Sequence, residues 1–408
     1  NHSLMNILFL GRFYPETLLN TIQADTRGKV GFSNHNFELS LIGGFATLPD
    51  VNLRVVTSPM AFSFPHNNRR AWIRSERYTT GKVEVTSVGF CNIAGINLIS
   101  PLKPLEREIL RCFDEFPEGS ILIVQNTPDA LLSTALFRAI DKTKRKVVTT
   151  LVIPDVPQCM LDMSGGDSLK HRLMRKNNDK VQRLSAKYDK YVYLTRQMDD
   201  FYHAGDGNYM VMEGLIDVSG IHDAPPAGYT GKEIILYTGT LRRIFGVMNL
   251  VEAFQKGDFK DTELWICGSG ECAELLKAKA EEDSRIKYFG LVDAAKARQL
   301  QQQATILANP RGAEGEYTKY SFPSKTIEYL LSGNTVIMNH LPGIPEEYDD
   351  YVFYPDNESA EAWVTKLREI MAIPATERKT RGMAAREFII TKKNASAQCR
   401  RIVELAAV

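Results

Sequence analysis

The stretch Met5-Asn-Ile-Leu-Phe-Leu-Gly11 is a short apolar run that ends at a glycine. A continuous apolar run bounded by turn residues is typical of a strand buried on both faces of a parallel sheet. Further runs of this kind lie at 52–57, 119–125, 146–153 and 191–195. A helical pattern at 129–140 separates the second of these from the third. Strands that alternate with helices predict right-handed βαβ units around a parallel sheet.

The alternation is interrupted by a segment rich in glycine and proline, and then starts again. This segment, 213–231, has the composition of an interdomain linker. Beyond it, helical patterns at 246–254 and 271–280 alternate with apolar runs at 232–238, 262–267, 286–289, 304–308 and 335–338. We therefore predict an α/β chain of two doubly wound, Rossmann-like domains that face each other across a ligand-binding cleft.

The predicted boundaries follow from these patterns. The N-terminal domain, on the acceptor side, is 1–212, and the linker is 213–231. The C-terminal domain is 232–386, and 387–408 is a terminal helix that can cross back to the N-terminal domain.

Composition excludes several classes of protein. The chain has 408 residues, of which 44% are hydrophobic and 24% charged, as is ordinary for globular proteins. Its 50 Lys and Arg residues balance 49 Asp and Glu residues, which argues against a nucleic-acid binder because phosphate binding needs a basic excess. The six cysteines lack zinc-site spacing, and neither a membrane span nor a signal peptide is recognisable. We expect a cytoplasmic protein without nucleic-acid partners.

A polar loop runs into a helix at Tyr317-Thr-Lys-Tyr-Ser-Phe-Pro-Ser-Lys-Thr-Ile-Glu328. The first turn of a helix presents free N–H groups and a positive dipole end, which suit a phosphate. Ser324 is placed as the N-cap, Lys325 adds a positive charge, and Glu328 can accept hydrogen bonds from the two hydroxyls of a ribose. A plain capped helix with a solvent-facing glutamate explains the pattern equally well.

Five segments carry a resemblance to a known family. In chain order they are Tyr237–Arg243 with Phe245-Gly246, Leu264–Glu271, Ile286–Leu291, Phe322–Gly333 and Leu341–Glu346. With these pieces the chain resembles the retaining glycosyltransferases of family 4, of the type that builds bacterial polysaccharides. The resemblance implies a GT-B fold, a UDP- or GDP-sugar as donor, and a glycan or lipid-linked saccharide as acceptor.

The resemblance assigns roles to the loop and helix around 320–328. The family has two glutamates in this region, and the second falls on Glu328, which would bind the nucleotide ribose. The first falls on Tyr320 and leaves the sugar unassigned, although Glu316 or Glu314 could reach the same place. The backbone of the intervening residues would hold the diphosphate, namely Ser321, Phe322, Pro323 and Ser324.

The family also places a basic pair on the diphosphate, and here Thr240 and Phe245 occupy those positions. Arg242 and Arg243 lie in the same loop and can replace the pair, unless they are ordinary surface arginines. The resemblance further implies that three residues after strands approach the donor with their backbones, namely Gly268, Gly270 and Leu291.

The N-terminal domain supplies fewer candidates. The resemblance implies that Gly31 faces the donor phosphates and that Asp155, after the run 146–153, is a polar or catalytic residue on the acceptor side. A turn aspartate between two prolines is an equal alternative for Asp155. Gln125 and Asn126 end another strand with the same ambiguity.

The implied reaction is glycosyl transfer with retention. The departing diphosphate would be neutralised by Arg242 and Lys325, with Asp155 and Glu316 as further catalytic candidates, and we expect no metal and no other cofactor. The alternatives are another GT-B enzyme, such as a nucleotide-sugar epimerase or a phosphorylase, and a degenerate non-catalytic subunit. A two-domain dehydrogenase is disfavoured because no GxGxxG follows the first strand.

A basic helical pattern at 168–187 bears on where in the cell the protein is located. It has seven basic residues and one acid, Asp179, with an apolar stripe of Leu169, Leu173, Val181 and Leu184. Such a helix can lie on the anionic inner face of a membrane. A solvated charged face over a packed stripe is the alternative.

Overall fold

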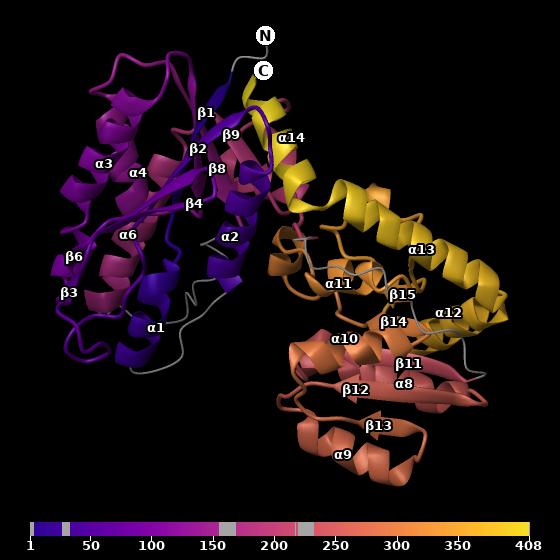
Figure 1. Cartoon of the computed structure of the whole chain (residues 1–408). Coiled ribbons are helices and arrows are strands. Elements are labelled where there is room, and N and C mark those ends of the chain that lie inside the picture. Colours follow the sequence, from indigo (N-terminus) through magenta and orange to yellow (C-terminus); the bar gives the residue numbers. More distant parts are fainter. Residues whose placement is uncertain (1–3, 27–32, 155–168, 217, 219–231, 408) are drawn as a thin grey trace. The chain divides into compact units, whose positions relative to one another are not determined.

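A computed structural model describes residues 4–26, 33–154, 169–216, 218 and 232–407. The chain divides into two compact units (Figure 1). Unit 1 comprises Asn1–Asp217 and Asn394–Val408, and unit 2 comprises Val218–Lys393. Of the predicted linker 213–231, residues 217 and 219–231 lie outside the described residues.

Unit 1 is built on an eight-stranded sheet with the order β10-β9-β8-β7-β1-β2-β5-β4. All neighbours are parallel except the edge pair β4 and β5. The strands are β1 (Met5–Gly11), β2 (Val51–Thr57), β4 (Glu76–Thr80), β5 (Val83–Ser87), β7 (Ile121–Asn126), β8 (Val147–Ile153), β9 (Lys190–Tyr193) and β10 (Tyr209–Val211). The central strands are buried on both faces, which explains their continuous apolar sequences.

Helices cover both faces of this sheet, with α2 and α14 on one face and α3, α4 and α6 on the other (Figure 1). The bounds are α1 (Glu16–Asp25), α2 (Ser33–Ala46), α3 (Leu102–Glu115), α4 (Ala130–Ile140), α6 (Leu169–Ser185), α7 (Asp199–Tyr202) and α14 (Ala395–Ala407), with 3₁₀ turns η1 (Ile96–Leu98) and η2 (Arg196–Met198). A small antiparallel pair, β3 (Trp72–Ile73) and β6 (Phe90–Cys91), stands apart from the main sheet.

Unit 2 has a six-stranded parallel sheet with the order β13-β12-β11-β14-β15-β16. The strands are β11 (Glu233–Thr238), β12 (Thr262–Cys267), β13 (Ile286–Tyr288), β14 (Ile306–Asn309), β15 (Thr335–Met338) and β16 (Val352–Phe353). The helices are α8 (Val247–Gly257), α9 (Ala273–Glu282), α10 (Ala294–Gln303), α11 (Lys325–Leu331), α12 (Ala360–Ala372) and α13 (Ala375–Lys392), with 3₁₀ turns η3 (Arg243–Phe245), η4 (Glu316–Tyr320) and η5 (Glu346–Tyr348). Two α/β domains with parallel sheets confirm the predicted fold class.

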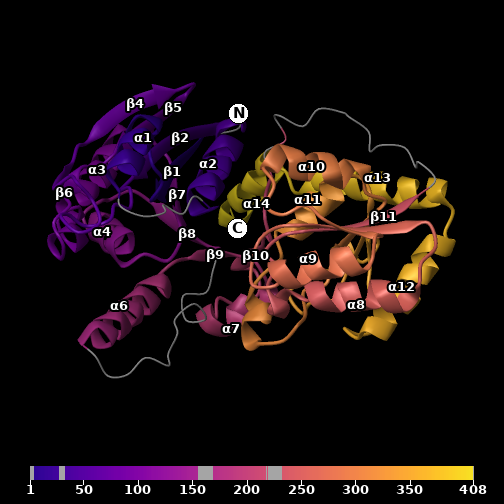
Figure 2. The same ribbon diagram turned by 90° about the horizontal axis from the view of Figure 1, so that it is seen from below.

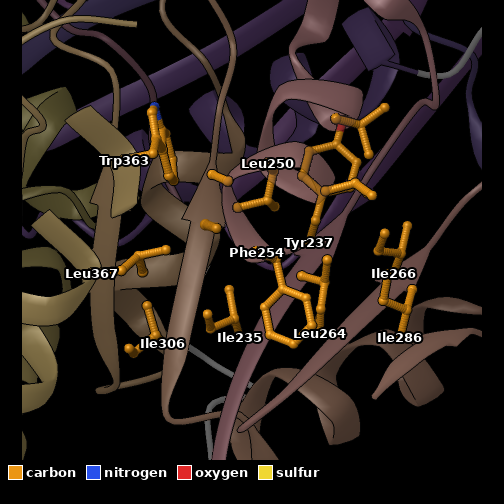
Figure 3. Packing of buried hydrophobic residues seen from close by; sticks show 14 of the residues in the cluster. Ile235, Tyr237, Leu250, Phe254, Leu264, Ile266, Ile286, Ile306, Trp363 and Leu367 are labelled. Carbon is orange, nitrogen blue, oxygen red and sulfur yellow. The ribbon is translucent and has the colours of Figure 1, made fainter. Parts of the chain in front are cut away.

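The core of unit 2 fixes the position of its strand ends. Figure 2 shows α10 and α11 on one side of the sheet and α8 and α9 on the other. Phe254 of α8 lies over Ile235 and Leu264 of the sheet, and Trp363 of α12 is also fully buried (Figure 3). Because these large side chains pack against the sheet, the loops at the strand ends rest on a rigid base.

The C-terminal segment differs from the predicted single helix at 387–408. Helix α13 ends in unit 2 at Lys392, and α14 begins in unit 1 at Ala395. The break is fixed by hydrogen bonds: the Ala395 N–H donates to the Ile216 carbonyl (2.9 Å), and the Asn394 side chain accepts from the Ala397 N–H (2.8 Å). Neither contact is visible in a local sequence pattern. In the part of the chain that the structure describes, no helix is long and apolar enough to cross a membrane.

Candidate functional site

The loops after three neighbouring strands of unit 2 pack against one another at the carboxyl edge of the sheet. The Gly239 N–H, after β11, donates to the Cys267 carbonyl (3.0 Å), and the Gly268 N–H, after β12, donates to the Gly290 carbonyl (2.8 Å). Ligands of open α/β sheets bind outside this edge, where parallel strands end. This edge is therefore the candidate site.

Two glycines after β12 allow the loops to approach closely. Gly268 has φ +144°, and a Cβ there would overlap the Gly239 carbonyl oxygen; Gly270 has φ +153°, and its Cβ would lie 2.6 Å from the Leu241 carbonyl oxygen. These φ values favour glycine, and the missing side chains leave main-chain groups at the surface of the site. The predicted donor-binding role of both glycines stays a prediction.

Arg311 is a site residue that the sequence did not single out. It follows β14, and its guanidinium carbon lies 5.5 Å from the centroid of the Phe245 ring, over which Arg242 also lies at 5.7 Å. The Arg311 Nη2 donates to the Ser321 Oγ (3.1 Å). Burial raises the pKa of Tyr237 to about 12, and the nearby charge of Arg311 opposes that rise. Arg311 thus joins the loop after β11 to the predicted phosphate loop.

The backbone at Arg311 is held by a buried hydrogen-bond network. The Asn339 side chain donates to the carbonyl oxygens of Pro310 (2.9 Å) and Arg311 (3.2 Å), and it accepts from the Trp363 indole N–H (2.9 Å). The available sequence signal was an arginine shortly after the apolar run 304–308.

Lys325 begins α11 at the same edge. Its Cε lies 3.7 Å from the place that a Cβ on Gly239 would occupy. Burial raises the pKa of Cys267, the last residue of β12, to about 11, and the charges of Lys296 and Lys325 oppose the rise. Lys325 Nζ also pairs with Glu328 Oε2 at 3.0 Å on a partly exposed surface. Two of the predicted residues are thus side by side and open to solvent.

The start of α11 differs from the predicted cap. Ser324 has helical backbone angles, φ −52° and ψ −28°, and its side chain makes no capping hydrogen bond. An N-cap serine needs an extended backbone to reach the amides ahead of it, so Ser324 directly precedes α11 as predicted but does not cap it through its side chain. The Pro323 carbonyl accepts from the Thr326 N–H (2.8 Å) instead. The Phe322 side chain is buried, with its ring centroid 5.5 Å from that of Tyr348. Only the backbone of Phe322 can therefore contact a ligand.

The remaining candidates are distributed as follows. The Arg243 N–H donates to the Glu271 carboxylate (2.8 Å), Leu291 is 79% exposed after β13, and Tyr320 ends η4. Glu316 is the first residue of η4. The two N-terminal candidates, Gly31 and Asp155, lie outside the described residues.

Unit 1 has a polar carboxyl edge of its own, centred on Glu38. This fully buried carboxylate accepts hydrogen bonds from the Arg12 N–H (2.9 Å), the Asn34 amide (3.1 Å) and the Asn126 amide (2.9 Å). Burial raises the pKa of Glu38 to about 7, and these hydrogen bonds oppose the rise. Asn126, which the sequence left ambiguous, therefore helps to hold a buried acid. The adjacent His35 is also buried, which lowers its pKa.

Glu38 predicts a pH dependence of stability. Its folded-state pKa lies above the ordinary value of 4.5, so the folded state holds a proton that the unfolded state has released. The stabilisation is complete below about pH 4.5 and is lost as the pH rises through about 7, at a cost of about 3 kcal/mol. Urea unfolding between about pH 5 and pH 8 should show this loss for the wild type and a smaller loss for Glu38→Gln. Equal slopes for the two proteins would contradict the assignment.

The apolar stripe of the basic helix α6 is only partly packed, unlike the fully packed stripe of the alternative interpretation. Leu173 is 59% exposed and Met174 is also exposed, whereas Val181 is buried. In Figure 2 the first half of α6 projects from the other elements of unit 1. The second half of the stripe packs at Val181, and α6 contacts α4.

A known family matches the part of the chain that holds this site. Residues 232–372, which contain the whole candidate site of unit 2, match the family model described as Glycosyl transferases group 1. No curated protein sequence matches the chain significantly.

Several solved structures share the fold over nearly the whole chain. Sucrose-phosphate synthase from Thermosynechococcus elongatus has a TM-score of 0.58 at 15% identity and covers 98% of each chain. The lipopolysaccharide outer core galactosyltransferase WaaB has a TM-score of 0.58 at 14% identity, covering 98% of this chain and 99% of its own. Anabaena HepE in complex with UDP has a TM-score of 0.58 at 14% identity, and the match covers 99% of this chain and 100% of its own. The chain therefore shares its fold with GT-B glycosyltransferase structures, and residues 232–372 match the Glycosyl transferases group 1 family model.

Proposed function

We propose that this chain is a retaining glycosyltransferase of family 4 that acts in surface polysaccharide biosynthesis. It transfers a sugar from a UDP- or GDP-sugar to a glycan or lipid-linked saccharide, without a metal or other cofactor. The observation that carries the proposal is the grouping of Arg242, Arg311 and Lys325 around the glycine turns of unit 2. The match of 232–372 and the UDP in the HepE structure support it.

The cations suit a leaving diphosphate. Negative charge grows on the diphosphate as the sugar becomes oxocarbenium-like, and fixed cations at that place lower the barrier. Arg311 provides a planar fork for phosphate oxygens, and both its guanidinium and that of Arg242 lie over the Phe245 ring. Phe245, which replaces a basic residue of the family pattern, thus serves as a platform for two arginines. The Ser321–Ser324 backbone completes the proposed diphosphate site.

Retention is proposed to occur at the front face of the sugar. The acceptor hydroxyl attacks the anomeric carbon on the side from which the diphosphate leaves. The bond from that carbon to the diphosphate oxygen breaks, and the departing oxygen takes the acceptor proton. Asp155, Glu316 and Gly31 keep the roles proposed for them from the resemblance.

Glu328→Ala should raise the KM for the nucleotide sugar by about tenfold while leaving the fold intact, because we place the ribose diol on this carboxylate. Steady-state kinetics with varied donor measure the effect. The matched control is Glu369→Ala, which removes a similar exposed pair with Lys366 on α12 and should leave KM unchanged. If both variants have the wild-type KM, the ribose does not bind at Glu328.

Incubation with labelled UDP- and GDP-sugars tests the proposed reaction. Transfer, or slow hydrolysis of the donor, supports a transferase. Tight binding without turnover supports the second candidate, a non-catalytic sugar-nucleotide-binding subunit, which Tyr320 in place of a glutamate favours.

Helix α6 is proposed as a contact with the inner face of the cell membrane. The exposed cations Arg172, Arg175 and Lys176 surround exposed Leu173 and Met174. Cations attract anionic headgroups, and the apolar side chains can insert at the interface. Such a contact would bring a lipid-linked acceptor within reach.

A further inference from the structure

Unit 1 exposes a concentration of large apolar side chains that neither the sheet nor α6 explains. They lie on 58–75 and 88–103, on and around β3, β6 and η1, and are Met60, Phe62, Trp72, Ile93, Ile96, Leu98 and Ile99. We call these seven side chains the apolar surface. Scattered exposed hydrophobic residues are normal, but such a concentration marks an interaction site.

The apolar surface is a single structured unit. The Trp72 and Cys91 backbones pair in the antiparallel ribbon, and the Asn97 side chain donates to the Ser63 Oγ (3.0 Å). Buried Asn92 donates to the carbonyl oxygens of Phe62 (2.8 Å) and Arg70 (3.0 Å). Figure 1 shows β3 and β6 side by side. The backbones are thus tied together, and the side chains are held outward by the fold.

The charged side chains within the two segments that carry the apolar surface are all basic. The two segments contain four cations, Arg69, Arg70, Arg74 and Lys103, and no Asp or Glu. Arg70 pairs with Asp25 of α1, while Arg69, Arg74 and Lys103 are exposed. A second copy of this chain would bring like charges together across a twofold axis. An anionic bilayer instead complements both the cations and the apolar side chains.

The position of the surface fits such a contact. The first segment leaves the sheet after β2 at Ser58, whose carbonyl accepts from the Arg12 Nη1 (3.0 Å), and the second leaves after β5. Both therefore start at the carboxyl edge of unit 1. Helix α6 ends at Ser185, shortly before β9 starts at Lys190, so its exposed first half is the half farther from the amino edge of the sheet.

We infer that the apolar surface is a docking site for an anionic lipid bilayer. The aromatic and aliphatic side chains enter the interface, and Arg69, Arg74 and Lys103 meet the phosphate headgroups. This inference does not rest on the proposed activity, because vesicle binding is measured without donor or acceptor.

Sedimentation with phosphatidylcholine vesicles, with or without phosphatidylglycerol, tests the docking site on the full chain. We expect binding that needs phosphatidylglycerol and weakens with salt. Bromine-labelled lipid should quench Trp72, the exposed tryptophan of the described residues. The triple variant Trp72→Ser, Leu98→Ser, Ile99→Ser should lose at least about tenfold in partitioning. Its side chains are exposed, so circular dichroism should be unchanged.

Control variants separate vesicle binding by the apolar surface from binding by α6 and from self-association of the chain. Leu39→Ser with Leu275→Ser removes exposed apolar side chains elsewhere and should bind vesicles like the wild type. If the triple variant also binds like the wild type, while Arg172→Glu with Arg175→Glu does not, α6 alone makes the contact and the inference is overturned. It is equally overturned if the wild type ignores vesicles and forms dimers that the triple variant cannot form.

Discussion

Arg311→Ala should lower kcat/KM for the nucleotide sugar by about 100-fold while leaving the fold intact. The arginine provides a fork of donors that lies over Phe245 and reaches Ser321. Its removal takes a fixed cation from the place where charge grows in the transition state, and such groups contribute about 2 to 4 kcal/mol to the barrier. Most of the loss should appear in kcat, because the charge is greatest in the transition state.

Two further variants make the Arg311 result specific. Arg311→Lys keeps the charge but loses the planar fork, so we expect an intermediate loss of about tenfold. Arg298→Ala removes an exposed arginine of α10 and should leave the kinetics unchanged. Equal activities for Arg311→Ala and Arg298→Ala would contradict a role of Arg311 in the site.

Gly268→Ala should destabilise unit 2 by about 3 kcal/mol or more and abolish nucleotide binding. Its φ of +144° is strained for any residue with a side chain, and the new Cβ would overlap the Gly239 carbonyl oxygen. Neither backbone can move freely, because the Gly268 N–H is bonded to Gly290 and the Gly239 N–H to Cys267. Strain and overlap of this kind rank among the larger effects of single substitutions.

The matched control is Gly43→Ala. Gly43 lies within α2, and a Cβ there would meet no atom within 4 Å. Alanine favours a helix over glycine by about 1 kcal/mol, so this variant should be slightly more stable than the wild type. Urea denaturation of both variants measures the contrast. A Gly268→Ala protein as stable as the wild type would show that the two loops are not in tight contact.

Local sequence predicted the central strands of both sheets for a clear reason. Strands such as β1 and β7 are buried on both faces, so nearly every side chain is apolar and the signal is strong. The edge strand β4 is mostly polar and half exposed, and β3 and β6 have two residues each. None of the three therefore has the apolar run by which a strand is recognised in the sequence. The break between α13 and α14 depends on Ile216, which is distant in the sequence.

The candidate site shows the same division. Gly268 and Gly270 follow a strand and Lys325 begins a helix, so the resemblance and the pattern of a helix start singled them out as candidates. Arg311 depends on Phe245, on Ser321 and on the Asn339 network, which only tertiary structure brings together. Ser324 has the residue type of a cap without its backbone conformation, which residue type alone does not determine.

Calorimetric titration with UDP, GDP, ADP and dTDP, each paired with its monophosphate, tests the central claim most directly. We predict that one diphosphate binds the wild type one-to-one with micromolar affinity and at least about tenfold more tightly than its monophosphate, because the cations contact the second phosphate. Arg311→Ala should remove that difference. Binding of none of the diphosphates, or equal binding of mono- and diphosphate, would contradict a diphosphate site at the carboxyl edge of unit 2.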